Sequence, residues 1–156
     1  MPHPTTDPGQ VDVRGPRFTA WVTTVVIVAT LVVSAFSTAA AAVVLGLQAV
    51  VFAIGAIGGP RRHPYGRVFA SVVAPRLGPV TEREPVAPLK FAQLVGFGFA
   101  AAGTLAFATG LFTVGLVLTA LALVAAFLNA AFGICLGCRL YPFVSRFTTP
   151  NKPNPA

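Results

Sequence analysis

The sequence predicts an all-α integral membrane protein whose four transmembrane helices are arranged as two hairpins. Hydrophobic residues make up 55% of the 156 residues and charged residues only 10%, whereas a soluble domain carries about 25% charged residues. The charges also avoid two long stretches. Residues 18–59 and 91–138, which are 42 and 48 residues long, contain no Asp, Glu, Lys or Arg. These observations exclude an ordinary soluble domain.

Each uncharged stretch is about twice as long as one membrane crossing requires. A spanning helix needs about 20 residues, and a single helix built from the 42-residue stretch would extend about 63 Å. In lipid the backbone must satisfy its own hydrogen bonds, so each stretch is expected to fold back on itself as a pair of helices.

The elements follow in order along the chain. Residues 1–16, with four prolines and two glycines, predict a disordered tail. The first pair of helices is expected at about 18–36 and 39–57, where Gly58-Gly59-Pro60 ends the second helix. The second pair is expected at about 91–108 and 113–134, and its last helix could extend through Cys138. The transmembrane domain therefore covers 17–141, and the prolines of 142–156 predict a second disordered tail. Small residues between Ser34 and Ala39 leave open a cleaved signal segment in place of the first helix.

The loop at 60–90 contains one further periodic pattern. Its apolar residues Tyr65, Val68, Phe69, Val72 and Val73 share one face of a helix. The pattern predicts a short amphipathic helix in the membrane interface. The alternative is a loop whose apolar side chains pack against the helix ends.

The positive charges predict the orientation. All eleven Lys and Arg residues lie before the first helix, in the 60–90 loop or after the fourth helix, and the two opposite turns have none. By the positive-inside rule, both termini and the loop are expected in the cytoplasm, as in a multi-pass protein of the inner (plasma) membrane. This topology accounts for the net charge of +7. Without a base-reading motif we expect contact with the lipid bilayer and none with nucleic acid.

The candidate functional residues are Cys135 and Cys138, the two cysteines of the chain, with Arg139 beside them. On a continuing helix, residues i and i+3 share a face, so the thiols would lie close together. Such a pair can undergo redox chemistry, relay sulfur or hold a soft metal, and Arg139 would favour the thiolates. Cytoplasmic thiols are normally kept reduced, so a permanent disulfide is not expected, whereas a reversible one stays open. Zinc requires four ligands and only His3 and His63 remain, so we predict no metal site.

A packing role is the competing interpretation of these cysteines. Gly133 and Gly137 form a G-x-x-x-G pattern around Cys135, which is typical of close helix contacts. On a continuous helix, Asn129 would point away from both thiols. Asn129 and Gln48 are therefore expected to make hydrogen bonds between helices. Since neither pair of helices contains an acidic or basic residue, active transport and acid–base hydrolysis are disfavoured.

Three motifs give the chain a family resemblance: Val11 to Phe18, Pro88 to Gln93, and Phe132 to Cys138 with Tyr141. Over about residues 10–146, the chain resembles domain of unknown function 4395, a family of bacterial membrane proteins. Its Ala-, Val- and Arg-rich composition is similar to that of actinobacterial proteins. Val13 stands where the family often has proline. The resemblance implies a membrane fold and no particular activity or cofactor. It also suggests that the three motifs form one cytoplasmic site around the thiols.

These observations lead to competing functional hypotheses. The first is thiol redox or sulfur handling through Cys135 and Cys138, tuned by Arg139, with a soluble thioredoxin-like or sulfur-transfer protein as partner. The second is a non-catalytic subunit or scaffold of a membrane complex, in which the glycine-rich helix faces form the interface. A third is passive transport of a small neutral solute. The sequence identifies no cofactor.

Overall fold

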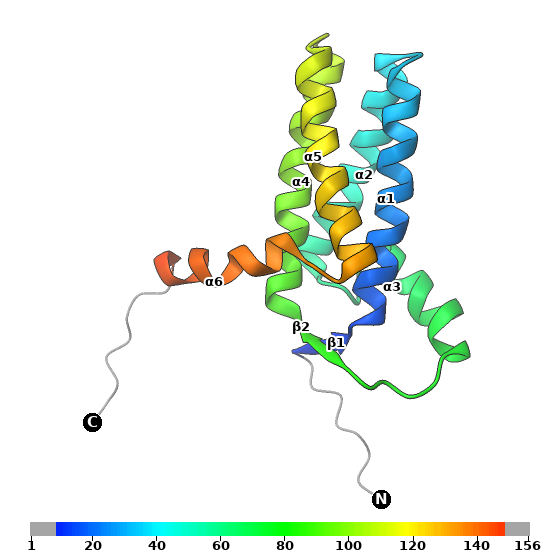
Figure 1. The fold of residues 1–156 in the computed structure, drawn as a ribbon, viewed down its shortest axis with the longest axis vertical. Helices are drawn as coiled ribbons and strands as arrows, with labels where there is room; N and C mark the ends of the chain where they lie inside the picture. The colour runs from blue at the N-terminus through cyan, green and yellow to red at the C-terminus, as the bar shows by residue number, and fades with distance from the viewer. Residues whose placement is uncertain (1–8, 149–156) are drawn as a thin grey trace, which may run out of the picture.

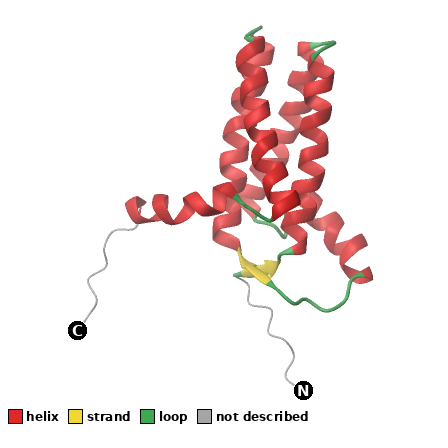
Figure 2. Cartoon of the chain, viewed as in Figure 1, coloured by secondary structure: helices red, strands yellow, loops and turns green. Residues whose placement is uncertain are grey.

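The computed structural model describes residues 9–148 and places four long helices side by side (Figures 1 and 2). The four are α1 (Arg14–Ser34), α2 (Thr38–Gly58), α4 (Val86–Ala108) and α5 (Phe112–Phe132). The most extensive contact is between α2 and α4, and α1 packs on α5. Contacts between α1 and α2 and between α4 and α5 close the ring.

The side chains of α1 are distributed as in a membrane helix. Its threonines face the interior, where Thr24 Oγ1 donates to the Ala20 carbonyl at 2.8 Å and Thr30 Oγ1 to the Val26 carbonyl at 2.9 Å. Val25, Val28 and Val32 face outward, and Val25 is 66% exposed. Water would favour the opposite arrangement. All four long helices are long and apolar enough to cross a membrane. The chain is therefore a multi-pass membrane protein.

Glycines of α4 let α2 pack closely on it. A Cβ atom at Gly96 would lie 2.8 Å from the Phe52 ring, and one at Gly103 would lie 2.8 Å from a methyl group of Leu45. Real carbon contacts are about 3.5–4.0 Å, so only glycine leaves room for these side chains. Leu45 and Phe52 belong to the main cluster of buried residues, which joins α2 to α4.

The connections 35–37 and 109–111 lie at one end of the bundle, which is at the top of Figure 1. In the first, Ser37 Oγ accepts a hydrogen bond from the Ala40 amide at 3.1 Å and caps α2. In the second, Gly110 has a φ of +80°, a conformation that favours glycine. Neither connection contains a charged residue.

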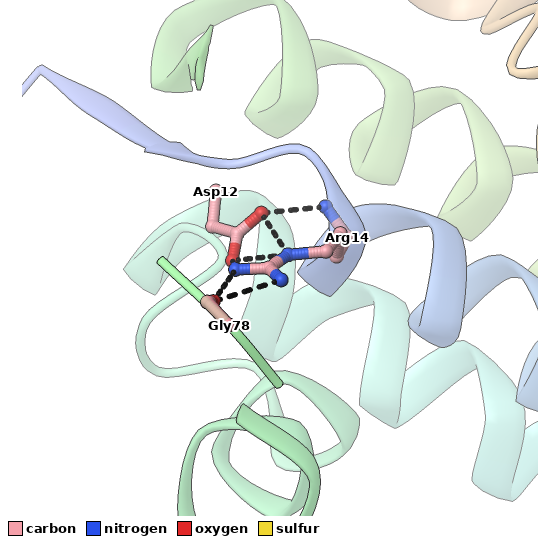
Figure 3. Close-up of polar contacts among 3 residues, drawn as sticks. All are labelled: Asp12, Arg14 and Gly78. Carbon is pink, nitrogen blue, oxygen red and sulfur yellow. Dashed lines mark hydrogen bonds and ion pairs between the residues drawn. The ribbon is translucent and has the colours of Figure 1, made fainter. Parts of the chain in front are cut away.

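The opposite end, here termed the basic end, carries the Lys and Arg residues that the structure describes (Figure 1). There β1 (Gln10–Asp12) pairs antiparallel with β2 (Arg83–Pro85). Asp12 accepts a hydrogen bond from the Arg14 amide at 3.0 Å and forms an ion pair of 2.8 Å with its guanidinium. The same guanidinium donates to the Gly78 carbonyl at 3.2 Å, which ties the long loop to α1 (Figure 3).

This strand and ion pair correct the predicted N-terminal tail of 1–16. Residues 10–12 form a strand, and α1 begins at Arg14. The tail prediction considered composition only, whereas β2 supplies hydrogen-bond partners from a distant part of the chain. Residues 1–8 lie outside the described range.

The periodic segment of the long loop is helical in three consecutive forms. It comprises α3 (Pro64–Val68), the π-helical η1 (Phe69–Val73) and the 3₁₀-helical η2 (Ala74–Arg76). Phe69 is buried against α1, with its ring centroid 5.7 Å from that of Phe18, while Val68 and Val72 stay exposed. The proposed place of this segment in the membrane interface stays a prediction.

The C-terminal part of the chain departs most from expectation. α5 ends at Phe132, and a separate helix, α6 (Leu136–Thr148), leaves the bundle sideways (Figure 1). The alternative in which the fourth transmembrane helix extends through Cys138 is therefore wrong. The predicted disorder from residue 142 is also wrong as far as Thr148, although 149–156 lie outside the described range. The apolar residues of α6 (Leu136, Leu140, Phe143 and Phe147) recur at helical spacing and form one face, which accounts for its helical structure despite Pro142.

Candidate functional site

The site is built on the turn that separates α5 from α6. Gly133 adopts the left-handed conformation, with φ of +68°. Its amide donates to the Asn129 carbonyl at 3.0 Å, and the Ile134 amide donates to the Leu128 carbonyl at 3.1 Å. Paired bonds of this kind terminate a helix. The Arg17 guanidinium donates to the Ala131 carbonyl at 3.4 Å, which places a cation at the negative end of α5.

The two cysteines lie at the start of α6. Cys135 immediately precedes the helix, and its sulfur accepts a hydrogen bond from the Cys138 amide at 3.2 Å. The Arg139 amide donates to the Cys135 carbonyl at 3.1 Å. The Cα atoms of Cys135 and Cys138 are 5.2 Å apart, and their sulfurs form a disulfide. The pair thus occupies a helix N-terminus, where negative charge on sulfur is favoured, and does not lie on the face of a continuing helix.

Gly137 fixes α6 to α4. A Cβ atom at Gly137 would lie 2.6 Å from the Cα atom of Ala92, so the two backbones are in contact. Nearby, the rings of Phe91 and Tyr141 approach to 5.9 Å. The predicted G-x-x-x-G face does not exist, because Gly133 belongs to the turn and Gly137 to the next helix. Gly137 itself does have a packing role.

A surface cavity of about 310 Å³ opens beside the disulfide at the basic end. The residues that line it are Glu84, Pro85, Pro88, Leu89, Gly133, Cys135, Cys138 and Arg139. The predicted site residues Cys135, Cys138 and Arg139 therefore meet in one place. Residues of the second and third motifs of the family resemblance line this cavity. Arg17 of the first motif contacts the adjoining end of α5. Lys90 does not line this cavity.

A second cavity of about 340 Å³ lies among α1, α4, α5 and α6. Its lining is mostly apolar, but Gln93, Asn129 and Cys135 belong to it. Asn129 was expected to point away from the thiols. That expectation assumed a continuous helix, whereas the helix ends at Gly133, and Asn129 and Cys135 line the same cavity. Cys135 lines both cavities, whereas Cys138 lines the surface cavity alone.

Glu84 is a site residue that sequence reasoning missed. Its local sequence, Glu82-Arg83-Glu84, is typical of a solvated loop. The pairing of β2 with Val11 places its side chain in the wall of the surface cavity. Burial raises the pKa of Glu84 and the charge of Glu82 raises it further, while Arg17 opposes the shift. A carboxyl group in this environment can hold a proton near the disulfide.

A separate polar cluster lies inside the basic end. His63 is 1% exposed and packs near Gly55 and Gln93, and burial lowers its pKa to about 4 against an opposing interaction with the Gln93 side chain. The Tyr65 hydroxyl donates to Gln48 Oε1 at 2.8 Å. Gln48, expected to make a hydrogen bond between helices, thus bonds the loop helix α3. Within residues 9–148, no group of three potential metal ligands occurs.

Comparison with known proteins gives one match. The model of the family described as a domain of unknown function (DUF4395) matches residues 11–146. The chain belongs to this family. The matched region covers the β1–β2 pair, the four long helices and α6 to Arg146, so the cysteine turn is part of the family domain. No curated protein and no solved structure matches the chain. The family description supplies no activity.

Proposed function

We propose that this member of the family is a membrane-embedded thiol–disulfide oxidoreductase that uses Cys135 and Cys138. The observation that carries the proposal is the position of the disulfide at the N-terminus of α6, in the wall of an open surface cavity. A helix N-terminus favours a thiolate. A merely structural disulfide would need neither the cavity nor the adjacent Glu84 and Arg139.

The proposed topology places this cavity in the cytoplasm. The four long helices would cross the inner membrane as two hairpins, with the basic end inside. Two features support this. The described Lys and Arg residues lie at that end, and the opposite connections have no charge. The apolar face of α6 would rest in the membrane interface beside the basic end. The helical segment 64–76 would lie there in the same way.

The exchange follows from the unequal positions of the two sulfurs. A thiolate of a dithiol partner attacks Cys138 Sγ, the sulfur that faces the surface cavity alone. The S–S bond breaks and Cys135 leaves with the electron pair, as a thiolate stabilised by the amides of α6. The partner's second thiolate then attacks its own bonded sulfur, and Cys138 is released. The partner loses two electrons and two protons, and the cysteines of this protein gain them.

Glu84 and Arg139 would support this step. Protonated Glu84 can supply the proton that Cys138 takes up when it is released, and its raised pKa increases the protonated fraction. Arg139 supplies positive charge at the attack site and attracts the incoming thiolate. A thioredoxin-like protein presents such a pair of thiolates, and so does a sulfur-transfer protein that carries two neighbouring cysteines.

The first test is a redox titration of the purified protein in glutathione buffers. Exchanging disulfides have midpoint potentials of about −180 to −270 mV, and structural disulfides lie below about −300 mV. We expect a midpoint in the higher range, measured by alkylation and mass spectrometry. Cys138→Ser leaves a single thiol, so it should abolish the two-electron exchange with glutathione disulfide. A pair that remains fully oxidised below −300 mV would refute the redox function.

A non-catalytic subunit remains the second candidate, and one observation favours it. Gly98 on α4 is exposed and a Cβ atom there would meet nothing within 4 Å. In contrast, Gly96 and Gly103 already pack within the chain. A smooth patch around Gly98 could accept a helix of a partner subunit. Native mass spectrometry of the wild type and Gly98→Leu tests this: a complex lost only in the variant would support the subunit role.

A further inference from the structure

The apolar cavity is accessible from the lipid-facing surface. Leu121 and Val124 line the cavity, and they are also 51% and 54% exposed on the outside of α5. Leu140 of α6, 52% exposed, lines it as well. The mouth therefore lies on a surface that faces hydrocarbon. A molecule that enters here must be soluble in lipid.

The lining restricts the occupant further. No charged residue belongs to it, so the occupant is neutral. The amide side chains of Gln93 and Asn129 and the hydroxyls of Thr19 and Thr23 interrupt the apolar wall. The two amides can donate hydrogen bonds to carbonyl oxygens. The volume of about 340 Å³ is in the range of small-molecule sites, about 300–1,000 Å³. A hydrocarbon chain alone would need no amide partners.

Cys135 adds a redox group to the same wall. Cys135 is the cysteine that lines both cavities, and the disulfide to which it belongs is a two-electron couple. The proposed function also needs an electron acceptor, because a cytoplasmic dithiol does not return to the disulfide without an oxidant. Quinones are neutral, lipid-soluble carriers of two electrons, and each has two ring carbonyls.

We infer that this cavity binds a membrane quinone, which accepts two electrons from the Cys135–Cys138 dithiol. The inference rests on the proposed function and adds its electron acceptor. The Cys135 thiolate bonds to a ring carbon, the Cys138 thiolate then attacks Cys135 Sγ, and the S–C bond breaks with its electron pair remaining on the ring. The cysteines return to the disulfide. The two protons of the dithiol go to the quinone oxygens, which gives a hydroquinone.

The test follows oxidation of the reduced protein by ubiquinone-1 in detergent, without oxygen. Its fully substituted ring disfavours stable addition of thiols. The readouts are hydroquinone formation and the mass of the alkylated protein. Ala126→Phe places a ring in the cavity, because Ala126 lines it. Ala120→Phe makes the same change on the same helix at an exposed position outside the cavity lining. Asn129→Leu removes one amide donor.

We expect Ala126→Phe to slow quinone reduction about tenfold or more, since misplaced reactants lose rates of this order. Ala120→Phe should behave like the wild type, and Asn129→Leu should require more quinone for half-maximal rate. Exchange with glutathione disulfide, which uses the other cavity, should be unchanged in all three variants. This second assay also shows that each variant is folded.

Two results would overturn the inference while the proposed function stands. One is normal exchange with glutathione disulfide but no quinone reduction by the wild type. The other is equal rates for Ala126→Phe and Ala120→Phe. A phospholipid that native mass spectrometry finds bound, and that excess ubiquinone-1 does not displace, would assign the cavity to a lipid chain instead. Loss of both activities in the wild type would refute the proposed function itself.

Discussion

The contact between Gly137 and Ala92 allows a quantitative test of how the cysteine turn is held. In Gly137→Ala, the new Cβ atom would lie 2.6 Å from the Ala92 Cα atom and 2.7 Å from its Cβ atom. Carbon atoms pack at about 3.5–4.0 Å, so α6 must move about 1 Å away from α4. Because the closest atom belongs to the backbone, no side-chain rotation relieves the clash.

The expected cost is that of overpacking, about 1–3 kcal/mol. It weakens the docking of α6 and leaves the four bundle helices in place. Because every 1.4 kcal/mol is a factor of ten, amide hydrogens of α6 that exchange by local opening should exchange about 5- to 150-fold faster. Ala92→Gly in the same chain removes the 2.7 Å contact and keeps the 2.6 Å contact. The double variant should therefore recover only part of the protection.

Hydrogen–deuterium exchange with mass spectrometry measures this effect on the purified protein in detergent. Gly98→Ala is the matched control, since it adds the same methyl group on α4 where nothing lies within 4 Å. That variant should leave α6 unchanged and stabilise α4 by about 0.5–1 kcal/mol. If Gly137→Ala exchanged no faster than Gly98→Ala, the backbone contact would not be what holds the cysteine turn.

Three further predictions concern the site and its support. At Gly133, φ is +68° and an added Cβ atom would lie 3.9 Å from its nearest neighbour. Gly133→Ala should therefore cost about 1–2 kcal/mol through backbone strain alone, and Gly133→Asn should cost less. Equal thermal stabilities of the two variants would contradict this. Burial lowers the pKa of His63 to about 4, whereas the ordinary value of 6.5 applies in the unfolded chain. Between these two pH values the unfolded chain binds a proton that the folded chain does not. The free energy of unfolding should therefore fall by about 3 kcal/mol as the pH drops from 6.5 to 4. Thermal melts followed by Trp21 fluorescence should show a smaller loss in His63→Leu, and equal losses would rule out His63 as the cause. Glu84→Gln should slow reduction of the disulfide by glutathione several-fold. After the rate is divided by the thiolate fraction of glutathione, which rises with pH, the wild type should show a fall that begins above the ordinary pKa of 4.5, because the pKa of Glu84 is raised. The variant should not show this fall, and an unchanged corrected profile would exclude Glu84 as the proton donor.

The sequence predicted the membrane fold because that prediction needs only composition and length. Two uncharged stretches of this size allow little other than paired helices in lipid, whatever the details of packing. Four helices follow from them directly. The positions of Cys135, Cys138 and Arg139 in one site were also predicted, since three residues this close in sequence cannot separate far.

What the sequence did not reveal depends on contacts between distant segments. The strand pairing of Val11 with Glu84 joins residues more than 70 positions apart and brings Glu84 to the disulfide. The local sequence around Glu84 is also typical of a solvated loop, so no sequence pattern could indicate its position beside the disulfide. His63 was considered only as a metal ligand, and its burial against Gly55 and Gln93 follows from helix packing.

The turn at Gly133 separates what the sequence determined from what the tertiary structure decided. The uncharged stretch runs from α5 to the cysteines without a break, so the sequence left open a helix that continues through Cys138. A single glycine with φ of +68° ended it, because the helix that follows docks on α4 through Gly137 and Ala92. By itself the sequence determined that the chain crosses the membrane and where its thiols lie along the chain. Only the tertiary structure decided that Cys135 would begin a helix and line two cavities, since backbone contacts between α6 and α4 fix its direction.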